Sequence, residues 1–157
     1  MRAALINPFL NSITKVLSTM AMTDATPGKA QIKEDELPWG DVTGIIALSS
    51  KDANGSFAIS FPKAVILSIT HKMLGERLDA IDDTVVDLVG ELTNMMSGGA
   101  KRLFAENGLD FDLAIPSILS GEGHTVTHKA VGPKIILPFT TEIGDFYVEV
   151  CFETDVH

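Results

Sequence analysis

The longest helical pattern in the chain runs from residue 82 to residue 108, and its two sides differ sharply in polarity. At about 100° per residue, its apolar side chains fall within a stripe roughly 60° wide, which is typical of a helix that buries one face. Asp82 or Asp83 can cap the start of this helix, and Asn107-Gly108 is a common helix end. The apolar stripe consists of Val85, Val89, Leu92, Met96 and Leu103, with Gly99 and Ala100 near its borders.

The opposite side of this helix is polar. The spacing places the carboxylate of Glu91 and the carboxamide of Asn94 one turn apart, both facing outward. A glycine inside a helix costs roughly 0.5–1 kcal/mol relative to alanine, so the glycines here need a reason. Gly99, near the apolar border, indicates close packing by a neighbouring element, whereas Gly98 would let a partner's backbone approach Glu91 and Asn94. The polar side carries Thr84, Asp87, Glu91, Asn94 and Gly98, followed by Lys101 and Arg102.

Two further helices are expected on either side of the first strands. Asn7-Pro8 is typical of a helix cap followed by proline at the first helical position, and apolar residues then recur at helical spacing up to Met20. Pro62 predicts the start of a second helix over 63–74, which Gly75 ends.

The rest of the chain predicts strands. A short edge strand is expected near 31–33, and 41–50 and 57–61 predict two strands joined by a turn at Asn54-Gly55. After the long helix, an extended segment over 111–120 contains Pro116, and alternation over 124–128 predicts another strand. Residues 134–141 and 145–153 predict a hairpin whose period-2 pattern implies one buried and one wet face.

This order of elements predicts an α+β fold. We expect an antiparallel sheet of about five to six strands, with a long central helix and two further helices packed on one side. The length of 157 residues and the hydrophobic share of 45% suit a single domain over residues 1–157.

Composition excludes several classes of function. The net charge of −9 argues against nucleic acid or an anionic membrane surface as the main partner and favours a partner with a basic docking face. Cys151, the single cysteine, excludes an internal disulfide, and we expect it to be a small buried hydrophobic residue. No apolar stretch reaches 18 residues, so we expect a soluble cytoplasmic protein without membrane insertion.

The sequence does not predict a metal site or a covalent nucleophile. His124 and His128 lie four apart on an expected strand, roughly 13 Å by strand rise, and could not share one ion. The chain has no H-E-x-x-H motif, Cys–His cluster, calcium loop, glycine-rich phosphate loop or G-x-S-x-G elbow. The histidines are most simply surface residues or hydrogen-bonded neighbours in the sheet.

Glu91 and Asn94 are the remaining candidates for chemistry. A spacing of E-x-x-N occurs by chance in about one chain in three of this length, so alone it is compatible with a solvated helix face. Asparagine is neutral and offers both a donor and an acceptor, which can align a water molecule. Alignment is the help that phosphoryl transfer needs, because its loose transition state requires little covalent participation.

At this helix the chain resembles the CheX family, within the CheC/CheX/FliY group of phosphatases that act on phosphorylated CheY. The likeness covers nearly the whole chain. The signature helix is VVDLVGELTNMMSGGAKRLF, and further similar segments are INPFLNSITKVLSTM, DVTGIIALSS, NGSFAISFP, KAVILSITHKMLG, AIPSILSGEG and IILPFTTEIGDFYVEVCFE.

The group's site pattern is an Asp or Ser, a Glu four residues on and an Asn three after that. Asp87, Glu91 and Asn94 meet this pattern, and Pro116 matches a later proline. The first helix has no second E-x-x-N, so the chain resembles one-site CheX and not two-site CheC. Asp87 has an alternative role, since near the first turns of the helix it can complement the macrodipole.

The resemblance implies an active site that works on a partner. Asn94 would orient the water that attacks the receiver's phosphoaspartate, and Glu91 would pair with the receiver's active-site lysine. Gly98 and Lys101 would contact the same partner, although Lys101 and Arg102 can also be a solvated charge pair. No cofactor is expected on this chain, because Mg²⁺ would come with the receiver. The resemblance also implies a homodimer joined through sheet edges, for which the C-terminal strands are candidates.

Two other classes of function remain open. The chain could be a non-catalytic module that binds a receiver or a motor protein, with the long helix as a docking ridge. It could also be a scaffold that dimerises through its sheet. Glu91 and Asn94 favour the enzyme, because docking alone does not need a carboxamide at that position.

Overall fold

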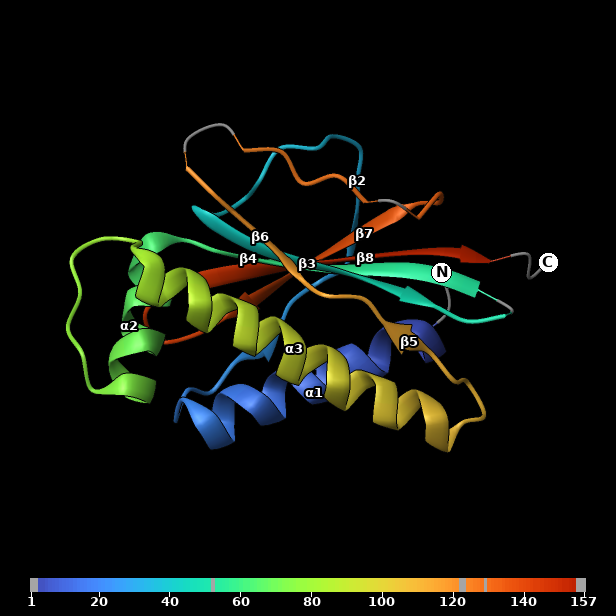
Figure 1. Cartoon of the computed structure of the whole chain (residues 1–157), viewed down its shortest axis with the longest axis horizontal. Helices are drawn as coiled ribbons and strands as arrows, with labels where there is room; N and C mark the ends of the chain where they lie inside the picture. The colour runs from blue at the N-terminus through green and yellow to red at the C-terminus, as the bar shows by residue number, and fades with distance from the viewer. Residues whose placement is uncertain (1–2, 52, 122–123, 129, 155–157) are drawn as a thin grey trace.

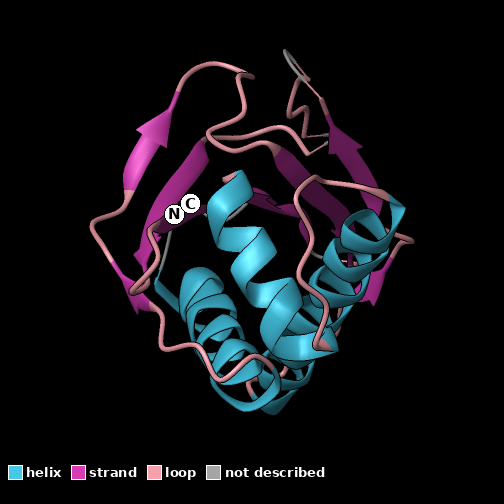
Figure 2. Cartoon of the chain, turned by 90° about the vertical axis from the view of Figure 1, so that its left-hand side faces the viewer, coloured by secondary structure: helices cyan, strands magenta, loops and turns pink. Residues whose placement is uncertain are grey.

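The computed structural model describes residues 3–51, 53–121, 124–128 and 130–154, and it has an α+β fold. The described part contains the helices α1 (Ala3–Met20), α2 (Lys63–Leu74) and α3 (Asp83–Glu106). Figures 1 and 2 show the helices gathered on the concave face of a curved sheet. The strands are β1 (Thr26–Pro27), β2 (Gln31–Lys33), β3 (Val42–Ser49), β4 (Ala53–Phe61), β5 (Asp112–Leu113), β6 (Ser117–Ser120), β7 (Lys134–Thr140) and β8 (Asp145–Thr154).

The sheet has eight antiparallel strands, more than the five or six expected. Its order is β1-β7-β8-β4-β3-β5, with β2 also paired to β7 and β6 also paired to β3. The edge strand expected near 31–33 is present as β2. The sheet also has the two-residue strand β1, and the extended segment expected over 111–120 forms two short strands, β5 and β6. Because β1 and β2 cover the outer side of β7, the C-terminal hairpin lies inside the sheet. Its expected place at an edge is therefore wrong.

The ends of two helices follow the sequence signals. The side chain of Asp82 accepts a hydrogen bond from the Val85 amide (3.2 Å) and caps α3. At the other end of α3, Gly108 has a φ of 81°, and the Leu109 amide donates to the Phe104 carbonyl. Gly75 ends α2 in the left-handed region, as expected. In the described part of the chain, no helix is both long and apolar enough to cross a membrane.

The first helix begins earlier than predicted. Pro8 lies inside α1, so Asn7-Pro8 is not its start. Proline in this position removes one backbone hydrogen bond. The additional turn places Leu5 in the core, where only 8% of its surface is exposed, and this burial offsets the lost bond.

The hairpin of β3 and β4 also differs from the prediction. Asn54 and Gly55 are not its turn but lie within β4, paired with Ser49 and Leu48. A Cβ on Gly55 would overlap the ring of Phe152 on β8, so this glycine serves packing between strands. The Asn54-Gly55 pair does not form the predicted turn, because a glycine in a strand can also mark the close approach of a neighbouring side chain.

Residues 124–128 do not form the expected strand. They cross the face of the sheet that lies away from the helices (Figure 1) and bind it through their side chains. His124 Nε2 lies 2.8 Å from Thr43 Oγ1, and His128 Nε2 lies 3.1 Å from Glu149 Oε1. Val126 donates its amide to the Glu36 carbonyl. His124 and His128 are thus hydrogen-bonded neighbours of the sheet.

Residues 124–128 bury polar groups on the face of β8 that the sequence predicts to be exposed to water. Lys33 Nζ lies 2.8 Å from Glu149 Oε2, and each side chain is only 1% exposed. Cys151 is fully buried on the same face, as expected for a small hydrophobic residue. Burial raises the pKa of its thiol. The alternation in the sequence is real, but the core covers one face of the strand, and β2 and residues 124–128 cover the other.

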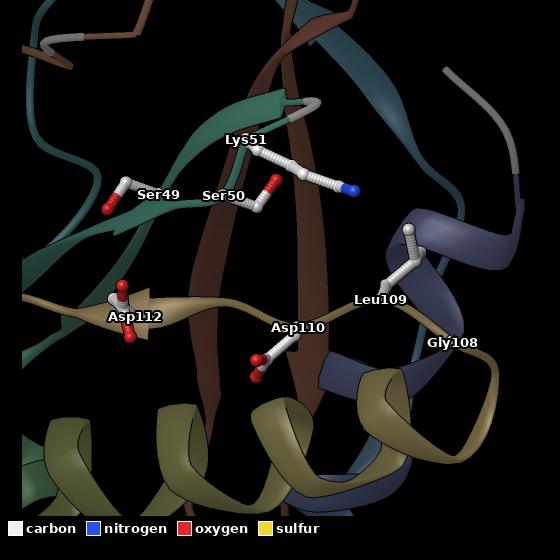
Figure 3. Close-up of a pocket in the computed structure, with 7 residues that line it drawn as sticks. All are labelled: Ser49, Ser50, Lys51, Gly108, Leu109, Asp110 and Asp112. Atoms are coloured by element: carbon white, nitrogen blue, oxygen red, sulfur yellow. The ribbon is translucent and has the colours of Figure 1, made fainter.

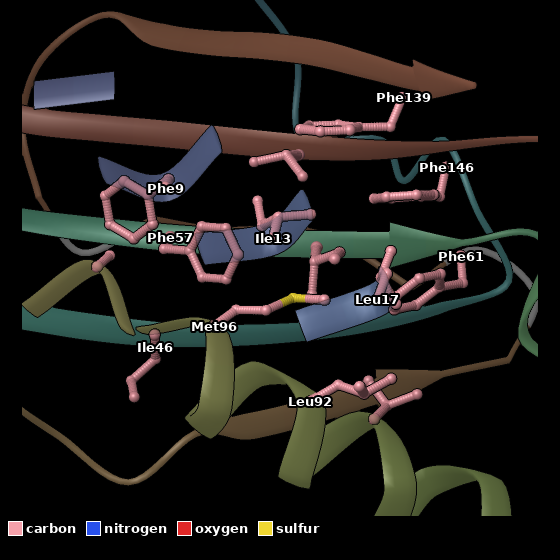
Figure 4. Close-up of a cluster of buried hydrophobic side chains, with 14 of the residues drawn as sticks. Phe9, Ile13, Leu17, Ile46, Phe57, Phe61, Leu92, Met96, Phe139 and Phe146 are labelled. Atoms are coloured by element: carbon pink, nitrogen blue, oxygen red, sulfur yellow. The ribbon is translucent and has the colours of Figure 1, made fainter. Parts of the chain in front are cut away.

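The main core lies between the helices and the sheet (Figure 4). Phe9 of α1 stacks on Phe57 of β4 with ring centroids 4.8 Å apart, and Phe139 stacks on Phe146 across the β7–β8 hairpin at 5.0 Å. Leu92 and Met96 bring α3 into the same core, where neither has any exposed surface. Of the predicted stripe, Val85, Val89, Leu92 and Met96 face inward, whereas Leu103 is only half-buried and lines a groove at the surface.

The buried ion pair gives a test of this packing. Lys33→Met leaves the Glu149 carboxylate buried without its lysine, which we expect to lower the free energy of unfolding by about 3–5 kcal/mol. Urea denaturation measures the change. The control Lys29→Met, at an exposed position, changes stability by no more than about 0.5 kcal/mol. A Lys33→Met protein as stable as the wild type would contradict a paired, buried Glu149.

Candidate functional site

Two close approaches position α3. On the sheet side, a Cβ on Gly44 of β3 would overlap Thr93 Oγ1, so the strand and the helix can touch only because Gly44 lacks a side chain. Against α1, a Cβ on Gly99 would overlap Ser12 Oγ. Ser12 donates a buried hydrogen bond to the Met96 carbonyl at 2.6 Å. The interpretation of Gly99 as a packing glycine is confirmed.

These contacts turn the polar side of α3 outward. Asp87, Glu91 and Asn94 are exposed, and Gly98 and Lys101 are half-buried along the same side. Within the described residues, the side chains of Glu91 and Asn94 have no hydrogen bond or ion pair. A carboxylate and a carboxamide one turn apart are thus available to a partner.

Gly98 differs from Gly99 although the two are adjacent. No atom outside its immediate helix neighbourhood lies within 4 Å of a Cβ built on Gly98. The protein's own packing therefore does not require a glycine here. Ser97, the hydroxyl next to it, is fully buried and cannot act as a nucleophile on the polar side.

A groove between α1 and α3 adjoins the polar side. It shares Gly98 with the line of Glu91 and Asn94, and its walls combine apolar side chains with basic and uncharged polar ones. The residues that line it are Asn11, Ser12, Lys15, Val16, Thr19, Met20, Met95, Gly98, Gly99, Arg102, Leu103 and Glu106.

A second hollow lies beyond the C-terminal end of α3 and is separate from the candidate site. It has a volume of about 350 Å³, and Asp110 and Asp112 lie in it opposite Ser49 and Lys51 (Figure 3). Fourteen residues of helical rise, about 20 Å, separate Gly108 at its rim from Asn94. Among the residues that the structure describes, no three His, Cys, Asp or Glu side chains are grouped as a metal site requires.

The geometry limits the chemistry that this site can perform. Glu91 and Asn94 stand on the exposed surface of a helix, and no described cavity includes either of them. Such a surface cannot enclose a small substrate, but it can be inserted into the open site of another protein. A carboxylate there can pair with a cation, and a carboxamide can hold a water molecule.

Comparison with known proteins decides the family. The family model of the chemotaxis phosphatase CheX matches residues 42–140, which include the whole of α3. The chain belongs to the CheX family. A chemotaxis protein CheX from Vibrio vulnificus is 47% identical, with a TM-score of 0.89 over 96% of this chain and 100% of that one.

Two more distant proteins are also similar to this chain. The CheY-P phosphatase CheX of Thermotoga maritima is 24% identical over 155 residues, covering 96% of this chain and 97% of its own. The CheX–CheY–BeF₃–Mg²⁺ complex from Borrelia burgdorferi contains a chain that is 24% identical, with a TM-score of 0.81 over 97% of this chain and 99% of that chain. At that identity the likeness establishes the fold alone.

Sequence reasoning missed the residues that hold α3 in place. Ser12 and Gly44 lie far from α3 in the sequence, and a lone serine in an apolar stripe or a lone glycine in a strand has many possible causes. It also missed the groove, for which α1 carries one signal: Lys15 is the only charged residue between Ala3 and Met20.

The adjacent glycines give a matched test of this arrangement. We expect Gly98→Ala to raise the free energy of unfolding by about 0.5–1 kcal/mol, because the methyl group meets open space and helix propensity improves. Gly99→Ala should lower it by about 1–3 kcal/mol, because the methyl group displaces Ser12. Urea denaturation of the two variants measures the difference. Changes of the same sign would contradict the packing described for α1 and α3.

Proposed function

We propose that residues 1–157 form one CheX-like domain that hydrolyses the phosphoaspartate of a CheY-like response regulator. One observation carries the proposal: Glu91 and Asn94 stand exposed and unpartnered, within the described residues, on the signature helix of a CheX family member. A Thermotoga maritima relative is named a CheY-P phosphatase, and a Borrelia protein of the same fold forms a complex with CheY, which support the choice of partner.

In this proposal Asn94 positions the attacking water. Its carbonyl oxygen accepts one proton of the water, and its amide group donates to a phosphoryl oxygen or a second water. The water oxygen attacks phosphorus in line, and the bond between phosphorus and the aspartyl oxygen breaks. The products are the free aspartate carboxylate and H₂PO₄⁻, so both protons of the water leave on the phosphate and no base on this chain is needed.

Glu91 fixes the register of the two proteins. Its carboxylate lies one turn before Asn94 and pairs with the active-site lysine of the receiver. Asp87, a further turn away, and Lys101 and Gly98 on the other side of Asn94 are proposed to contact the receiver surface. Gly98 in particular leaves room for the partner's backbone, since nothing in its own protein fills the space above it.

The metal ion belongs to the receiver in this proposal. Glu91 is the one carboxylate beside Asn94, and Asp87 stands two turns away from Asn94, which is too few ligands for Mg²⁺. The complex that contains CheY, BeF₃ and Mg²⁺ supports the same assignment. When bound to the receiver, Mg²⁺ neutralises charge on the phosphoryl oxygens.

We also propose that the protein forms a homodimer through its sheet edges. The free edges belong to the short strands β1 and β2 on one side and to β5 and β6 on the other. The second of these edges packs against α3, with Ile118 of β6 beside Gly90.

Asn94→Ala tests the catalytic role. We expect it to slow dephosphorylation at saturating phosphorylated receiver by about 100-fold or more, because the water loses its alignment. Binding to the receiver should be largely kept. The measurement is the lifetime of a phosphorylated CheY-like receiver from the same organism with no addition, with the wild type and with the variant. Equal acceleration by both proteins would disprove the proposed role of Asn94.

Glu91 and its neighbours give the complementary test. Glu91→Ala should weaken both binding and hydrolysis, because the ion pair with the receiver lysine is lost. Glu91→Gln restores the shape of the side chain but not its negative charge. Binding is measured with the receiver loaded with Mg²⁺ and beryllofluoride. Binding without any acceleration by the wild type would instead identify a docking module that recognises a receiver or a motor protein.

A further inference from the structure

Glu91 and Asn94 are too small a surface to hold a receiver domain. A stable interface buries about 800 Å² on each partner and involves about 20–30 residues a side. The contact must therefore extend from Asn94 in at least one direction. Charge distinguishes the two directions along α3.

The N-terminal direction is acidic. The phosphorylated site of a receiver is itself anionic, because a phosphoryl group brings nearly two negative charges and its Mg²⁺ needs carboxylate ligands. An anionic surface is repelled by the start of α3 and the segment before it, where Arg77 is the one basic residue. The acidic residues there are Glu76, Asp79, Asp82, Asp83 and Asp87.

The surface immediately C-terminal to Asn94 is basic, although Glu106, Asp110 and Asp112 follow beyond it. Lys101 and Arg102 follow Gly98 on α3. Arg102 and Lys15 of α1 both line the groove, and Lys101 is the neighbour of Arg102 on α3. No side-chain ion pair is recorded for these three residues within the described part of the chain. α1 contains no acidic residue, although the chain has 21. An overall charge of −9 thus coexists with a local patch of the opposite sign.

The groove also has the composition of an interface. Methionine and arginine are enriched and acidic residues are depleted in the centres of protein interfaces. Here Met20, Met95 and Leu103 supply apolar surface, Met20 with half of its surface exposed, and Glu106 is the one acid, at the far end. Because Met95 follows Asn94 directly and Gly98 lies one turn on, the groove is continuous with the proposed site.

We propose that the groove between α1 and α3 is the second half of the receiver-docking surface, and that its occupant is the anionic surface beside the receiver's phosphoaspartate. This inference rests on the proposed function. It assigns a role to α1, whose residues Asn11, Lys15 and Thr19 contact the receiver without taking part in the chemistry.

Charge reversal tests the surface. The double variant Lys15→Glu/Arg102→Glu should weaken binding of the receiver loaded with Mg²⁺ and beryllofluoride by about tenfold or more, mainly through slower association. The salt dependence of binding should be less steep than in the wild type. The rate of dephosphorylation at saturating receiver should not change, because Glu91 and Asn94 are intact. The control Lys29→Glu makes the same change of charge at one residue on the sheet edge. It should leave the affinity for the receiver within about twofold of the wild type.

A label placed in the groove gives a second, independent measurement. Asn11→Cys can be labelled selectively with a maleimide fluorophore, because the one native thiol, Cys151, is fully buried. Addition of the loaded receiver should protect the label from acrylamide quenching, whereas it should not change the quenching of the same label on Lys29→Cys. Unchanged affinity of the double variant, or a groove label as accessible in the complex as in the free protein, would overturn the proposal.

The two levels of inference fail in different ways. If Asn94→Ala dephosphorylates the receiver as fast as the wild type, the catalytic proposal fails, and protection of the Asn11 label still establishes the groove as a docking surface. If Asn94→Ala is inactive and the groove variants bind normally, the catalytic proposal stands and the receiver extends over another surface.

Discussion

The site depends on the close packing of one helix against a strand and a second helix. Gly44 brings β3 against Thr93, and Gly99 brings α1 against the turn that contains Met96, where Ser12 donates its buried hydrogen bond. Each contact fixes the rotation of α3 about its axis, because a turn of the helix in either direction would force a side chain into a neighbour. Glu91 and Asn94 are exposed as a consequence of contacts on the opposite sides of the helix.

An exposed active site suits a substrate that is itself a folded protein. A small molecule must be enclosed, whereas a phosphoaspartate in a receiver already lies in a pocket with its metal ion and its lysine. In the proposed mechanism the phosphatase then needs to supply only the attacking water and its alignment, which a rigid helix can do with two side chains. Because only two side chains take part, specificity for the receiver must come from the surface around the helix. The basic groove beside α1 has the location and charge for this role.

The far face of the sheet has a different role. Lys33, Glu149 and His128 form a buried polar group under the segment 124–128. These contacts tie β2 and the irregular segment 124–128 to β8 and cover a face of the sheet that would otherwise be open. They lie on the side of the sheet away from α3, so the proposed catalytic surface and this polar layer are separated by the full thickness of the sheet.

Local signals made much of this protein predictable. The stripe from Val85 to Met96, the cap at Asp82 and the glycine after α2 each act within one or two helical turns, and the structure has them where the sequence places them. The polar line of Asp87, Glu91 and Asn94 follows from the same helical period.

Contacts between distant segments could not be predicted in this way. The two-residue strands β1 and β5 form only because longer strands bind them, and Gly55 makes room for a ring on β8 that lies about a hundred residues away. Residues 124–128 have the alternation of a strand, but His124 and His128 bond to side chains of the sheet and the Val126 amide bonds to the Glu36 carbonyl, so no strand ladder forms. The sequence by itself determined which face of α3 is polar, because helical periodicity is local. Only the tertiary structure decided what lies beside that face, because the groove is made by two helices about eighty residues apart.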